Sequence, residues 1–89
     1  MDPSLPGADL VEQGLEDLRR GVESVPALLV AMASGRLRDL GFAVARDVPD
    51  AHLKLYELLA AELGDGAHSR FNALQRQLVS FIRAQACAR

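Results

Sequence analysis

Apolar residues recur at helical spacing from the first predicted element onwards. In that segment four of them follow at intervals of four, three and four: Val11, Leu15, Leu18 and Val22. Such intervals place side chains on one face of an α-helix. Asp9 stands before this stripe as a capping residue, and Gly21, next to its last member, is the expected terminator. The pattern predicts a helix over residues 9–21, preceded by a flexible lead-in of residues 1–8 that contains two prolines and a glycine.

The second predicted helix is apolar on every side in its first part. Ser24 can cap it, and Pro26 is tolerated in a first turn, where its missing donor has no partner. The helical period continues to Leu40, so we expect one helix over residues 25–40, kinked at Ser34–Gly35. A helix that is apolar all round is buried all round. In a chain of 89 residues we therefore expect a second molecule to cover part of residues 25–33.

Two further helices follow a connection over residues 41–49, which we expect to be a loop. The first spans residues 49–63, with one stripe composed of Leu53, Tyr56, Leu59, Ala60 and Leu63. The second spans residues 66–87, with a heptad-like stripe composed of Phe71, Leu74, Leu78 and Phe81. Gly64, Asp65 and Gly66 between them form a tight turn, which favours antiparallel neighbours.

These four helices predict an all-α fold, a small four-helix bundle of up-down antiparallel topology, because two of the three connections are short. Residues 9–89 are then a single helical-bundle domain. The predicted core takes the apolar stripe of each helix. It comprises Val11, Leu15, Leu18, Leu29, Met32, Leu37, Leu40, Tyr56, Leu59, Leu63, Phe71, Leu74, Leu78, Phe81 and Ile82.

Composition and charge exclude several classes of function. The net charge of −2 gives no general attraction to nucleic acid or to an anionic membrane. Aromatic residues make up 4% of the chain, which limits base stacking. Cys87 is the single cysteine, so no internal disulfide is possible and a reducing cytoplasm is expected. The longest apolar run, residues 25–33, is too short to span a bilayer, and residues 1–9 lack the pattern of a signal peptide.

The residues that carry chemistry in other proteins do not form a recognisable motif here. His52, His68 and Cys87 lack the spacing of a zinc site. Ser69 adjoins His68, but neighbours on a helix point about 100° apart. The paired carboxylates of Glu16 and Asp17 lie on the predicted wet face of the first helix. We therefore expect a protein without metal, cofactor or catalytic site.

One alternative comes from the segment RDVPDAH, in which five residues separate Arg46 from His52. This spacing resembles that of the HEPN family of helical ribonucleases and nucleotidyltransferase partners. The resemblance implies a dimer in which Arg46 and His52 face an RNA phosphate across the interface, and in which the histidine helps to cleave the backbone. It covers seven of the 89 residues, and Pro49 interrupts the segment.

A second alternative comes from the uneven distribution of charge. The first 24 residues carry six acidic residues and two arginines, whereas the last 24 carry four arginines and no acid. Arg76 and Arg83 are two helical turns apart and therefore align, and Arg70 lies nearby. This arginine face is either paired with the acidic first helix or a weak nucleic-acid contact, although we regard nucleic acid as an unlikely partner given the net charge.

The number of apolar residues exceeds what one small core is expected to bury. This favours a non-enzymatic protein-interaction or homo-oligomerisation module, with a homodimer as the expected state. The expected interface combines the second helix with the stripe of the last one. It comprises Val25, Leu28, Leu29, Val30, Met32, Phe71, Leu78 and Phe81. Lys54 is the only lysine in an alanine-, leucine- and arginine-rich chain, which suggests a GC-rich, bacterial genome.

Overall fold

The computed structural model describes residues 7–88, and it contains helices and no strand in that part of the chain. The elements are α1 (Ala8–Arg20), α2 (Val25–Met32), α3 (Ser34–Asp39), α4 (Ala51–Leu63), a 3-10 turn (Gly64–Gly66) and α5 (Ala67–Ala88). The all-α prediction is confirmed. Most of the predicted lead-in, residues 1–6, lies outside the described residues, and Ala8 already belongs to α1.

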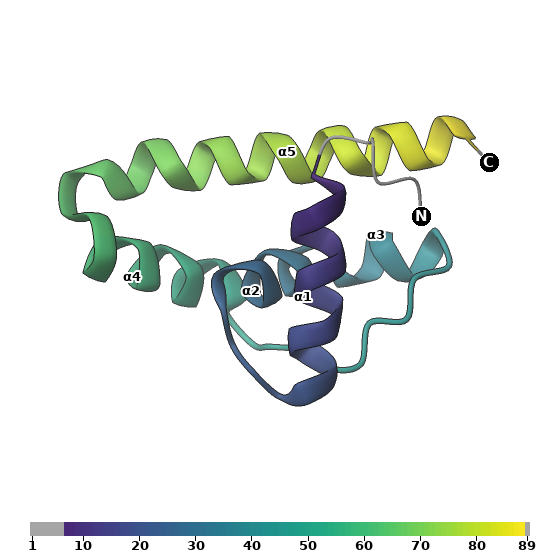
Figure 1. The fold of residues 1–89 in the computed structure, drawn as a ribbon, viewed down its shortest axis with the longest axis horizontal. Helices are drawn as coiled ribbons and strands as arrows, with labels where there is room; N and C mark the ends of the chain where they lie inside the picture. The colour runs from purple at the N-terminus through teal and green to yellow at the C-terminus, as the bar shows by residue number, and fades with distance from the viewer. Residues whose placement is uncertain (1–6, 89) are drawn as a thin grey trace.

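Helix α2 forms the centre of the molecule, with α1, α4 and α5 packed around it (Figure 1). Its residues Ala27, Leu28, Leu29 and Val30 are each no more than 1% exposed within the single chain. Residues 27–31 and Ala33 therefore need no second molecule to cover them, whereas Val25 and Met32 remain half-buried. The chain's own helices supply the cover because α1 lies against one side of α2 while α4 and α5 lie against others.

The total accessible surface of the chain agrees with that conclusion. It is 5192 Å² for a mass of 9.6 kDa. A folded monomer of this mass exposes about 5,100 Å². The single chain thus exposes about as much surface as a monomeric protein of its size normally does.

The predicted helix over residues 25–40 is two helices. The chain leaves the α conformation at Ala33, whose φ is −116° and ψ is 25°, and it resumes in α3. The break precedes the predicted kink at Ser34–Gly35. Leu37 remains fully buried after it. Turning the chain at Ala33 sends α3 beneath the C-terminal half of α5, as Figure 1 shows.

Helices α1 and α2 approach closely because Gly14 lacks a side chain. A methyl group at Gly14 would overlap the backbone carbonyl of Pro26 and the side chain of Val30. The same helix pair is joined by hydrogen bonds at its turn. Ser24 Oγ donates to Asp17 Oδ2 at 2.5 Å and accepts from the Ala27 N–H at 3.2 Å. Asp17 is therefore buried and bonded, which corrects its placement on a wet face.

The loop from α3 to α4 is held down by two apolar residues and one arginine. Val44 and Val48 are buried. Arg38 donates to the carbonyl of Val44 at 2.9 Å and pairs with Asp47 at 2.8 Å. The loop ends at Asp50, whose φ of 54° is positive, so α4 begins at Ala51, two residues later than predicted.

Helices α4 and α5 lie antiparallel, joined by the 3-10 turn, whereas α1 runs across α5 in Figure 1. The regular up-down arrangement is therefore not confirmed. Nine of the fifteen predicted core residues are buried, and four are half-buried against the core. Tyr56 and Leu63 are exposed, which corrects their assignment to the core.

Candidate interaction surface

Helix α4 carries two apolar stripes on different faces. The inner stripe contains Ala51, Leu55 and Leu59, and it is buried against α2 and α5. The outer stripe consists of Leu53, Tyr56, Ala60 and Leu63 at intervals of three, four and three. The exposed fractions are 53% for Leu53, 39% for Tyr56 and 48% for Leu63. We call these four residues the outer α4 stripe.

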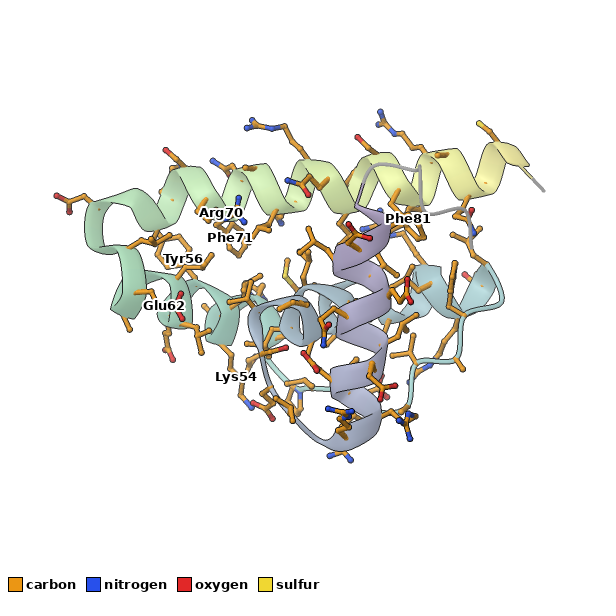
Figure 2. The ribbon with its side chains drawn as sticks, in the orientation of Figure 1. Lys54, Tyr56, Glu62, Arg70, Phe71 and Phe81 are labelled. Carbon is orange, nitrogen blue, oxygen red and sulfur yellow. The ribbon has the colours of Figure 1, made fainter. Side chains whose placement is uncertain are left out.

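An aromatic contact links the outer α4 stripe to α5. The ring of Tyr56 meets the ring of Phe71 edge-on, with 5.5 Å between centroids. Figure 2 shows both side chains in the space between α4 and α5. His68, also on α5, lies near Tyr56, at 6.4 Å between ring centroids. Tyr56 is thus held by its neighbours on α5 while part of its surface stays open, as is common for an amphipathic ring at a surface.

A shallow depression of about 580 Å³ continues the outer α4 stripe toward α2 and α3. Its apolar lining includes Met32, Phe71 and Ala51. Its polar lining includes Arg36, Asp50, His52 and Gln75. Phe71 lines this depression and also contacts Tyr56, so it lies between the depression and the outer α4 stripe.

Most of the predicted interface residues lie inside the chain's own core. Leu28, Leu29, Val30, Leu78 and Phe81 are each at most 3% exposed, so another molecule cannot reach them without unfolding the domain. Val25, Met32 and Phe71 are half-buried. The prediction is thus corrected for the five buried residues. The sequence predicted a stripe that contains these residues but not its exposure, because Tyr56 and Leu63 were assigned to the core.

Arg46 and His52 have different neighbours. The guanidinium of Arg46 lies against Gly21, at the end of α1. His52, the second residue of α4, lines the depression with Arg36 and Phe71. Among the described residues no hydrogen bond or ion pair joins Arg46 to His52. The HEPN-like site therefore gains no geometric support within one chain.

The expected pairing of the acidic first helix with the basic last helix is absent from the described residues. Glu16 pairs instead within α1, accepting from Arg19 Nε at 3.0 Å and from Arg20 Nε at 3.1 Å. The hydrogen bond from Arg19 holds the pKa of Glu16 below its ordinary value, and the same contact raises the pKa of Arg19. Arg76 and Arg83 stay exposed on the outer face of α5.

A second hollow lies between α1 and the loop over residues 43–45. Its volume is about 860 Å³, and it is lined by carboxylates of α1, Asp9, Glu12 and Glu16, over an apolar floor that includes Leu15 and Val44. The carboxylates and the arginine of this hollow come from one helix, and the Glu16–Arg19 pair already satisfies part of the charge. We find no geometry there that positions a reacting group.

Groups of at least three metal-ligating side chains do not occur between residues 7 and 88. His52 lies in the depression, His68 lies beside Tyr56 and bonds to Asn72 at 3.2 Å, and Cys87 is an exposed free thiol near the end of α5. Within the same residues, each helix is too short or too polar to cross a membrane.

Comparison with known proteins finds no relative of this chain. Neither a protein-family model nor a curated protein nor a solved structure matches it. The resemblance to the HEPN family therefore rests on Arg46 and His52 alone, and the argument for function rests on the surface just described.

Proposed function

We propose that this chain is a non-enzymatic protein-interaction module that docks its partner on the outer α4 stripe. One observation carries the proposal: Leu53, Tyr56 and Leu63 are exposed along α4, whose inner stripe already packs into the core. These side chains add little to the stability of the isolated fold. Apolar side chains gathered on one exposed face mark an interaction site more often than scattered ones do.

The chemistry of the stripe suits a protein partner. Tyrosine is enriched at the energetic centres of interfaces, because it buries a large rigid ring and keeps a polar tip. Here Tyr56 is held in place by Phe71, so little side-chain entropy remains to be lost on binding. Leucines on both sides of Tyr56 can exclude water from a docked surface. The free thiol of Cys87 accords with a reducing compartment, so we place the module in the cytoplasm.

Site-specific photo-crosslinking tests the proposal. A photoreactive phenylalanine analogue replaces Tyr56 in the full chain, and extract from the host of origin is added. We expect a crosslinked protein band that disappears when Leu53→Ser and Leu63→Ser are introduced together, because both leucines lie on the same stripe.

The matched control places the same analogue at Val22. Val22 is 48% exposed, as Leu63 is, but it lies at the turn between α1 and α2. Equal crosslinking from Val22 and Tyr56 would show non-specific contact, and absence of any crosslinked protein, self included, would contradict the proposal.

A second candidate function, contact with a nucleic-acid backbone, is favoured by the composition of α5. Its 22 residues contain no Asp or Glu, and Asn72, Arg76, Ser80 and Arg83 line one side of it. Two phosphate contacts give a weak, salt-sensitive affinity. Fluorescence anisotropy with labelled single-stranded RNA at low salt tests this function, with Arg76→Gln and Arg83→Gln expected to abolish the signal.

A further inference from the structure

The outer α4 stripe has the spacing of a two-stranded coiled-coil seam. In heptad notation Leu53 and Ala60 occupy a positions, while Tyr56 and Leu63 occupy d positions. We infer that a second copy of this chain occupies the stripe, with the two α4 helices parallel about a twofold axis. This inference rests on the proposed function and names the partner for that same surface.

The polar side chains beside the stripe fit a parallel second copy. His52 falls at a g position and Glu57 at the following e position, and both are exposed. In a parallel pair the g residue of one helix faces the e residue five positions later in the other helix. Each interface would therefore place His52 of one copy beside Glu57 of the second copy, twice by symmetry. An imidazole can donate a hydrogen bond to a carboxylate, and when protonated it pairs with it electrostatically.

The antiparallel alternative uses the same leucines but places the charges poorly. When Leu53 faces Leu63 of the second copy, the two Glu57 carboxylates approach each other, and His52 lies opposite Gly64. Like charges in close apposition destabilise an interface. The other charged groups around His52 are Arg36 and Asp50, which have opposite sign and line the same depression. Because their charges are opposite, these two groups add no net charge beside His52.

The stripe is short, so the expected dimer is weak. It spans ten residue steps, about 15 Å of helix. Two heptads alone do not form a stable coiled coil, because the helices must first be ordered. Here α4 is already ordered by its inner stripe, which removes that cost. For so short a stripe we expect weak association, with a dissociation constant on the order of 10⁻⁴ M.

Sedimentation equilibrium of the full chain tests for the second copy. We expect the apparent mass to rise toward twice 9.6 kDa between roughly 10⁻⁵ and 10⁻³ M. Leu53→Ser together with Leu63→Ser should weaken association at least tenfold, whereas Val22→Ser, an equally exposed control away from α4, should leave it unchanged. A wild-type chain that stays monomeric to 10⁻³ M overturns the inference.

A charge exchange tests the parallel register. Glu57→Lys alone should weaken association roughly two- to thirtyfold, because two pairs are lost. His52→Glu combined with Glu57→Lys should restore it, because the pair is rebuilt with its signs exchanged. Failure of the double variant to recover association, with thermal unfolding unchanged, contradicts the parallel arrangement.

Cysteine crosslinking provides an independent measurement. In a Cys87→Ser background, Ala60→Cys should form an intermolecular disulfide under mild oxidation, because an a position faces itself in a parallel pair. The wild-type chain with its exposed Cys87 serves as the comparison. If the chain sediments as a monomer but crosslinks a different protein through position 56, the second copy is refuted and the proposed function stands. If it sediments as a monomer and crosslinks no protein, both the second copy and the proposed function are refuted.

Discussion

Gly14 shows how a single hydrogen atom in place of a side chain sets the distance between two helices. By helix propensity alone, replacing this glycine should stabilise α1 by about 1 kcal/mol. The structure reverses that expectation, because the added methyl group would meet the Pro26 carbonyl and the Val30 side chain. The requirement for glycine at this position comes from packing between α1 and α2, and the pattern of α1 contains no sign of it.

We therefore expect Gly14→Ala to lower the free energy of unfolding by about 1–3 kcal/mol, the usual cost of overpacking. Gly35→Ala is the matched control. Gly35 also lies in a helix, but nothing lies within 4 Å of an added Cβ atom there, so the change should be neutral or stabilising by up to about 1 kcal/mol. Urea unfolding of both variants measures the difference, and equal effects would contradict the close approach.

Ser24 joins the end of α1 to the start of α2 through two hydrogen bonds of one hydroxyl group. Ser24→Ala removes the cap on the Ala27 N–H and takes one of two side-chain partners from the buried Asp17, whose other donor is Gln13 at 2.9 Å. We expect a loss of about 1–3 kcal/mol in unfolding free energy. Ser80→Ala, on the exposed face of α5, is the control and should change the free energy of unfolding by less than about 0.5 kcal/mol. Equal losses of stability for the two variants in thermal unfolding would contradict the role of Ser24.

At the scale of the element, the sequence predicted where helices occur more accurately than which face they bury. Ser24 does cap α2, and Gly21 ends α1 with a φ of 79°, both as predicted. For α4 the assignment of faces was wrong, because leucines occur on both sides of the helix and the 3.6-residue period fits either stripe. Only the packing of Leu55 and Leu59 against α2 distinguishes them.

This distinction predicts opposite outcomes for two leucines two positions apart. Leu55→Ala should lower the free energy of unfolding by about 2–5 kcal/mol, because Leu55 is fully buried. Leu53→Ala should change it by less than about 0.5 kcal/mol, because Leu53 is more than half exposed. Chemical denaturation at a protein concentration well below that of self-association makes the comparison. A large loss for Leu53→Ala would show that the outer stripe supports the fold.

For the whole molecule, the apolar surplus lies in a different helix from the one the sequence indicated. The run over residues 25–33 was expected to exceed one small interior, yet the helices of the same chain bury residues 27–31 and Ala33. The surplus appears on α4 instead. The fold and the proposed self-association are therefore separable, and we expect this molecule to differ from an obligate dimer.

Dilution tests that separation. The far-UV circular dichroism spectrum should be the same at about 1 μM and at about 500 μM, because the core is complete in one chain. The melting temperature should rise only slightly over the same range, as expected for weak coupling of association to folding. Loss of helical signal on dilution would show that the core needs the second copy after all.

The sequence alone determined the all-helical class, most helix boundaries and most of the core in α1 and α5. Those features depend on capping, glycine conformation and helical period, which act over a few residues. The tertiary structure decided that α2 lies at the centre, that Gly14 is a packing residue and that the outer face of α4 is free. Burial of one helix depends on how all the others compete for its surface, and no local pattern contains that information.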